Sequence, residues 1–159
     1  MTSIQPKIHV NEPVTVVGLH IRTTGSESAT SIPSLWHEVE SGAISVPGKI
    51  SDDLYAVYAN LENAGVSNAG HFSLIIGYAV APGSAVPTGL TLVTIPRSHR
   101  ASFSVPENDP RRVVEAWQNA WAFDDHQKTF ICEYELYRAD GEATVNVGVW
   151  EPGRDNEFN

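Results

Sequence analysis

One order of elements occurs twice in this chain, and it is the strongest constraint on the fold. Residues 14–22 are mostly apolar and β-branched, which predicts a buried strand. A helix with apolar residues at helical spacing follows Ser31, and residues 54–61 and 71–80 are then predicted to be two more strands. The first half therefore has the order strand, helix, strand, strand.

The second half repeats this order after a joint at 81–89 that is rich in Pro and Gly. Residues 90–105 are strand-like, with one interruption. A helix begins at Asp109-Pro110, because Asp is a good helix cap and Pro suits the first helical position. Two strands are expected to follow, at 129–137 and 142–150.

This arrangement predicts an α+β fold. Short links between consecutive strands indicate an antiparallel sheet, and the two helices are expected on one side of it. We expect a single domain over residues 1–159, in which two duplicated β-α-β-β units, at about 8–80 and 90–151, are related by a pseudo-two-fold axis. A ligand cleft is expected between the halves, since pockets favour such interfaces.

Each predicted helix has one apolar stripe, which is expected to face the core. Trp117 is interpreted as a core residue alone, whereas Trp36 and Trp121 could also face the cleft. The two stripes consist of Ile32, Leu35, Trp36 and Val39, and of Val113, Val114, Trp117 and Trp121.

The charge balance restricts the partners. The chain has 10 Lys and Arg against 19 Asp and Glu, a formal net charge of −9. Direct nucleic-acid binding is not expected, because it needs clustered basic residues. The acidic excess favours cationic partners, or it only keeps the protein soluble. No segment approaches the ~20 apolar residues of a membrane span, so a cytoplasmic protein without a membrane partner is expected.

Signatures of catalysis are scarce. The sequence has no His-Glu-x-x-His, Gly-x-Ser-x-Gly, Gly-x-Gly-x-x-Gly or Walker motif. Cys132 is the single cysteine, which excludes an intramolecular disulfide and predicts a small buried hydrophobe. We therefore expect no cofactor, no bound metal and no catalytic residues.

Residues 129–137 carry the most informative pattern. Strand alternation places Glu133, Glu135 and Tyr137 on one face of an otherwise apolar strand. A buried carboxylate must be protonated or find a donor, such as a tyrosine hydroxyl, and it would then favour a cation that brings its own apolar surface. Glu135 is the stronger candidate, while Glu133 could equally lie on a solvated face.

Aromatic side chains complete this hypothesis, because each aromatic face attracts a cation by about 0.5–2 kcal/mol. The candidate ligand-binding residues are Glu135, Glu133, Trp36, Tyr55, Tyr78, Trp121, Tyr137 and Trp150.

The order of elements and four short segments resemble the gyrase-inhibitor-like effector-binding domain, the ligand-sensing part of some AraC-type and multidrug-responsive transcription regulators. The resemblance extends from about Val14 to Trp150, and it is strongest to stand-alone members carried on bacterial integron gene cassettes, which bind cationic drugs. The segments are Tyr55–Tyr58, His71–Gly77, Gly89–Pro96 and Tyr134–Tyr137.

This resemblance implies a pocket between the halves for bulky lipophilic organic cations. The family's aromatic–Glu–aliphatic–Tyr motif corresponds to Tyr134–Tyr137, so Glu135 is the implied cation-binding carboxylate. Two positions depart from the family: Ala56 stands where Gly is frequent, and Trp150 is an extra aromatic that could reshape a pocket wall. The regulators also have a helix-turn-helix domain, for which these residues leave no room.

The expected function is therefore a stand-alone module that sequesters a cation, or senses it and signals through an unknown protein partner. One alternative is a hydrolase that uses the buried Glu as a general acid or base. Another is a gyrase-type inhibitor that acts through protein interaction, since an acidic surface can imitate nucleic acid.

Overall fold

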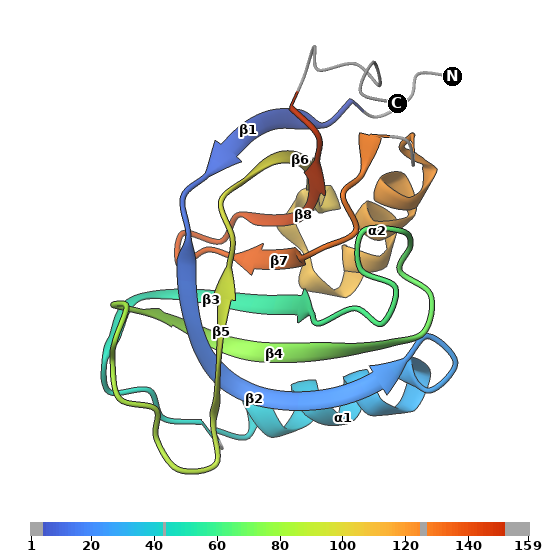
Figure 1. The fold of residues 1–159 in the computed structure, drawn as a ribbon. Helices are drawn as coiled ribbons and strands as arrows, with labels where there is room; N and C mark the ends of the chain where they lie inside the picture. The colour runs from blue at the N-terminus through green and yellow to red at the C-terminus, as the bar shows by residue number, and fades with distance from the viewer. Residues whose placement is uncertain (1–4, 43, 125–126, 152–159) are drawn as a thin grey trace.

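The computed structural model describes residues 5–42, 44–124 and 127–151 (Figure 1). Eight strands, two α-helices and two short 3-10 turns form the described part of the chain. Their order is β1 (Lys7–Asn11), β2 (Val14–Thr24), α1 (Ser28–Glu40), β3 (Lys49–Ala59), β4 (His71–Val80), β5 (Thr91–Ile95), β6 (Ser98–Ser104), 3-10 turns at Pro106–Asn108 and Pro110–Arg112, α2 (Val113–Ala122), β7 (Glu133–Tyr137) and β8 (Ala143–Val149).

All eight strands form one curled antiparallel sheet with the order β1-β6-β8-β7-β3-β4-β2-β5. The order is symmetric about the central pair of β7 and β3. Each half also begins with a strand that pairs with the other half, because β1 pairs with β6 and β5 pairs with β2. The predicted α+β class and antiparallel sheet are thus confirmed, and β1 is an additional strand beyond those predicted from the sequence.

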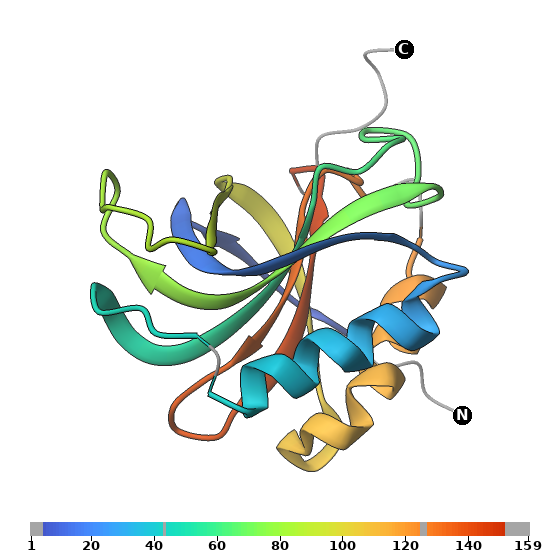
Figure 2. The ribbon, with the colours of Figure 1, turned by 90° about the horizontal axis from the view of Figure 1, so that it is seen from below.

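Both helices cover the same face of the sheet (Figure 2). Helix α1 packs Leu35 against Leu74 and Ile76 of β4. Helix α2 packs Trp117 in the other apolar cluster of this face, which includes Val145 of β8. Each helix therefore covers its own apolar cluster, and Tyr58 of β3 packs against both clusters.

Several element boundaries differ from the prediction. Helix α1 begins at Ser28, so Ser31 lies inside it, where its hydroxyl contacts that of Thr23 at 2.7 Å. Asp109 does cap the turn before α2, by accepting a hydrogen bond from the backbone N–H of Arg111. Strand β7 begins only at Glu133, because Phe130 has a φ of 53° and its carbonyl is bonded to the loop after β3.

The opposite face of the sheet has its own apolar core. Cys132 is 4% exposed in this cluster, as the sequence predicted, and burial raises the pKa of its thiol to about 11. Arg100 is buried beside it and donates hydrogen bonds to the side chain of Asn11 and the carbonyls of Pro96 and Cys132. This arginine thereby connects the end of β1, the residue after β5 and the residue before β7.

Strands β2 and β4 approach each other closely at Gly18 and Gly77, which are directly paired. A Cβ atom on Gly18 would lie 2.0 Å from the carbonyl oxygen of Ile76, and one on Gly77 would lie 2.0 Å from that of Val17. Both obstacles are backbone atoms of a paired strand. The curvature of β2 at this point therefore depends on two glycines.

We expect Gly18→Ala to lower the free energy of unfolding by about 1–3 kcal/mol or more, because the strands must separate to admit the methyl group. Urea denaturation followed by circular dichroism measures this change. Gly25→Ala is the matched control, since no atom lies within 4 Å of its added Cβ. Equal stability of the two variants would contradict the close-approach argument.

Candidate functional site

A cavity of about 920 Å³ lies between the two helices and the sheet. It is lined by side chains of both helices, by β3 and β7, and by the loop that joins β3 to β4. The lining is mostly aromatic and apolar, with carboxylates at one wall. The lining includes Trp36, Leu54, Tyr58, Phe72, Trp117, Trp121, Glu133, Glu135 and Tyr137.

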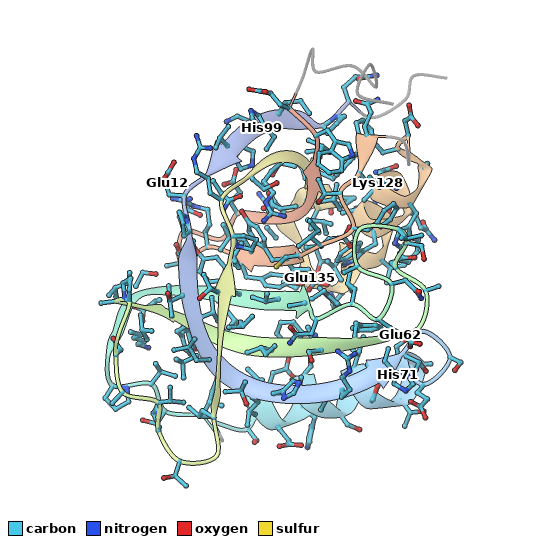
Figure 3. All side chains as sticks on the ribbon, viewed as in Figure 1. Glu12, Glu62, His71, His99, Lys128 and Glu135 are labelled. Atoms are coloured by element: carbon cyan, nitrogen blue, oxygen red, sulfur yellow. The ribbon has the colours of Figure 1, made fainter. Side chains whose placement is uncertain are left out.

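Glu135 lines this cavity, and it lies near the middle of the molecule in the view of Figure 3. Its side chain is only 3% exposed. Oε2 accepts hydrogen bonds from Tyr58 Oη at 2.8 Å and from Trp117 Nε1 at 2.7 Å. Oε1 accepts one from Tyr137 Oη at 2.5 Å.

The three donors come from three different elements. Tyr58 lies on β3, directly opposite Glu133, and Glu135 is opposite Ala56 on the same face of the sheet. Tyr137 is two residues further along β7, so it also shares that face. Trp117 reaches the carboxylate from α2, which covers this face from above.

The ionisation of the cluster is set mainly by burial. Desolvation raises the pKa of the Glu135 carboxyl above its usual range, and the three hydrogen bonds oppose that rise because they stabilise the charged form. Burial and the nearby carboxylate raise the pKa of Tyr58 and of Tyr137 strongly. Both hydroxyls therefore keep their protons and remain donors.

Aromatic rings surround the carboxylate in edge-to-face and stacked contacts. Trp36 meets Tyr137 edge-on, with ring centroids 5.5 Å apart. Tyr58 meets Trp117 in the same way at 5.2 Å, and Trp117 stacks on Trp121 at 6.1 Å. Such contacts hold the rings in fixed orientations, so the cavity has preformed walls.

Five of the eight predicted ligand-binding residues line this cavity: Trp36, Trp121, Glu133, Glu135 and Tyr137. Among these five residues, Trp121 is 55% exposed to solvent, whereas Glu133 is buried. A buried carboxylate was expected to find a tyrosine donor, and Glu135 has two, Tyr58 and Tyr137.

The structure does not bring Tyr55, Tyr78 and Trp150 into the cavity. Tyr55 points to the opposite face of the sheet, where its ring lies 6.0 Å from that of Tyr134. Tyr78 shares the helical face but lies near the end of β4, under the Lys49 ammonium. Trp150 borders a separate hollow of about 420 Å³ with Ile131.

Three aromatic residues of the cavity were not among the predicted ones: Tyr58, Trp117 and Phe72. Tyr55 and Tyr58 are three residues apart on one strand, so alternation places them on opposite faces, but it does not say which face carries the cavity. The pairing of β3 with β7 decides this. The helical stripe predicts a core position for Trp117, and this residue is buried, yet its indole N–H donates a hydrogen bond to Glu135.

The described residues show neither a metal centre nor a membrane helix. No group of three or more His, Cys, Asp or Glu side chains in them could hold a metal ion. Neither of their helices is long and apolar enough to cross a membrane.

Comparisons with solved structures show the same fold in three other proteins. An integron cassette protein from the mobile metagenome of Vibrio cholerae has a TM-score of 0.72 at 18% identity, over 91% of this chain and 95% of its own. A protein described as a bacterial transcription regulation protein from Staphylococcus aureus has a TM-score of 0.68 at 12% identity, over 94% and 100%. The structure of SAV2435 bound to tetraphenylphosphonium has a TM-score of 0.74 at 14% identity, over 98% and 99%.

A comparison with curated protein sequences gave no significant match. The model of one protein family, described as Cass2, integron-associated effector binding protein, matches residues 7–152. This range includes every described strand and helix, and all the residues around Glu135. The chain therefore belongs to the Cass2 family of integron-associated effector-binding proteins.

Proposed function

We propose that the chain binds bulky lipophilic organic cations in the cavity around Glu135. The observation that carries this proposal is a single arrangement: a buried carboxylate, held by three donors, inside an aromatic cavity of about 920 Å³. A volume of this size lies in the range of small-molecule sites. A cation with large apolar groups would fill the space and compensate the charge together.

Two contributions to affinity have different roles in this proposal. Burial of apolar and aromatic ligand surface provides most of the free energy, because the lining is dominated by side chains such as Trp36, Tyr58 and Trp117. The carboxylate then selects cations over neutral and anionic molecules of the same shape, and aromatic faces add to that preference.

One of the structures with this fold supports the ligand class. SAV2435 was solved with tetraphenylphosphonium, a bulky cation with four aromatic rings. The two chains share only 14% identity, so the likeness concerns the fold, and the cavity residues of the present chain provide the rest of the argument.

We further propose that binding is the activity, and that the module sequesters the cation or signals its presence to a protein partner. The hydrolase alternative requires a carboxyl group that exchanges protons with a substrate. In this cavity both oxygens of Glu135 already accept hydrogen bonds from Tyr58, Trp117 and Tyr137. Ester turnover that is lost in Glu135→Gln would favour the hydrolase instead.

Glu135→Gln is expected to weaken the binding of tetraphenylphosphonium by about 1–3 kcal/mol, the usual range for a buried charged contact. Glutamine can keep the three contacts, because its carbonyl oxygen can accept from Tyr58 and Trp117 while its NH₂ group donates to the hydroxyl of Tyr137. The variant therefore removes the charge with little change in shape. Quenching of tryptophan fluorescence measures the dissociation constant.

The matched control is Glu133→Gln, which makes the same change of charge two residues away on β7. We expect it to cost less, because Glu133 is outside the cluster of three donors. Tetraphenylborate, an anion of nearly the same shape, controls for the ligand and is expected to bind weakly to the wild type. An unchanged dissociation constant in Glu135→Gln would remove Glu135 from the site.

Cation binding is also expected to depend on pH. Burial raises the pKa of Glu135, so the free protein holds a proton there over a pH range in which an ordinary glutamate is ionised. A bound cation favours the ionised form. Affinity should therefore rise as the pH increases through the raised pKa, and binding below that pKa should release a proton. Titration calorimetry in buffers of different ionisation enthalpy measures that release, and Glu135→Gln should abolish it.

A further inference from the structure

We infer that the cavity selects cations whose charged centre has no N–H donor, such as quaternary ammonium and phosphonium ions, over primary ammonium ions of matched size. This inference rests on the proposed function, since it concerns the same ligand site. It names the subclass of cations that the hydrogen bonds around Glu135 favour.

The basis is the number of acceptor positions on the carboxylate. An ionised carboxylate has about four lone-pair positions, two on each oxygen. Among the described residues, Tyr58 and Trp117 occupy both positions on Oε2, and Tyr137 occupies one on Oε1. One position is left for a ligand, although the full negative charge is still there.

A primary ammonium group brings three donors, and each needs an acceptor when it is buried. Beside the remaining position on Glu135 Oε1, the acceptors of this cluster are the hydroxyl oxygens of Tyr58 and Tyr137, and the partly buried Tyr58 packs its ring against those of Phe72 and Trp117. The other buried carboxylate of the lining, Glu133, also has an interaction within the chain. A buried ammonium could thus place only one of its donors on the carboxylate, and the others would have to use neutral acceptors, whose hydrogen bonds are weaker.

An onium ion avoids this cost. Its charge is spread over methyl or aryl groups, which need apolar contact and no hydrogen-bond acceptor. The rings of Trp36, Tyr58 and Trp117 supply that contact around the carboxylate. The charge of Glu135 acts on such an ion through space, at the low dielectric of a mostly apolar cavity. The three donors therefore hold the carboxylate in place, and they also occupy acceptor positions that a ligand with N–H donors would need.

The test compares 4-phenylbenzyl-trimethylammonium with protonated 4-phenylbenzylamine at pH 8, by tryptophan fluorescence and calorimetry. We expect the trimethylammonium ion to bind at least about tenfold more tightly to the wild type. Its methyl groups also add apolar surface, so the decisive quantity is how the ratio of the two dissociation constants changes in a variant that frees an acceptor.

Tyr137→Phe is that variant, because it removes the donor on Oε1 and leaves two positions open there. The preference for the trimethylammonium ion should fall at least about threefold, since the primary ammonium gains an acceptor. Both ligands require the ionised carboxylate, so a change in the pKa of Glu135 cancels in the ratio. Tyr58→Phe, which frees a position on Oε2, is the second variant if Tyr137→Phe does not fold.

Tyr55→Phe is the matched control. It removes a tyrosine hydroxyl on the opposite face of the same sheet, and the ratio should not change. Equal or tighter binding of the primary ammonium to the wild type, or an unchanged ratio in both donor variants, would overturn the inference while leaving cation binding intact. If neither cation binds to the wild type, the proposed function fails, and this inference fails with it.

Discussion

The three hydrogen bonds to Glu135 are the interaction on which the rest of the site depends. A carboxylate this deeply buried carries a large desolvation cost, and it stays compatible with the fold only because donors replace the lost water. The donors belong to β3, α2 and β7. The carboxylate therefore joins the two halves of the chain, and it also fixes the aromatic rings that form the walls of the cavity.

The strand register places these groups together. Central strands β3 and β7 pair so that Ala56 faces Glu135 and Tyr58 faces Glu133. A shift of one residue would send Tyr58 to the opposite face and bring Tyr55 into the cavity, because neighbouring side chains on a strand alternate between faces. The register is supported on both faces at once, since Tyr55 and Tyr134 pack in the opposite core while Tyr58 contacts Glu135.

Most of the fold could be predicted from the sequence, because local patterns of residues determine most of its elements. The repeated order of elements and the Asp109 cap depend on residues that are close in the chain. Strand β1 was missed, since its five residues alternate polar and apolar side chains too briefly to stand out, and its place is decided by pairing with distant β6.

The site was only partly predictable, for a related reason. Glu135 and Tyr137 belong to one strand, so alternation alone brings them together. The choice between Tyr55 and Tyr58 depends on the register of two strands about 80 residues apart, which no local pattern contains. Trp117 presents a different difficulty. Helical periodicity shows that it points inward, but it cannot distinguish an apolar core from a polar contact at the wall of a cavity.

The symmetry of the sheet explains why one carboxylate can occupy this position. The strand order is symmetric about the pair of β3 and β7, and Ala56 and Glu135 form the middle pair of the five that join these strands, so a two-fold axis through this ladder relates Glu135 to Ala56. Directly paired side chains lie about 5 Å apart at Cβ. A second carboxylate there would add like-charge repulsion in a buried site, and a large apolar side chain would take the space of the carboxylate and its donors. Alanine, fully buried at this position, leaves room for a single charge beside the axis. The duplicated architecture thus provides the cavity. The two halves differ at this one pair of residues, and the glutamate on one side gives the cavity its negative charge.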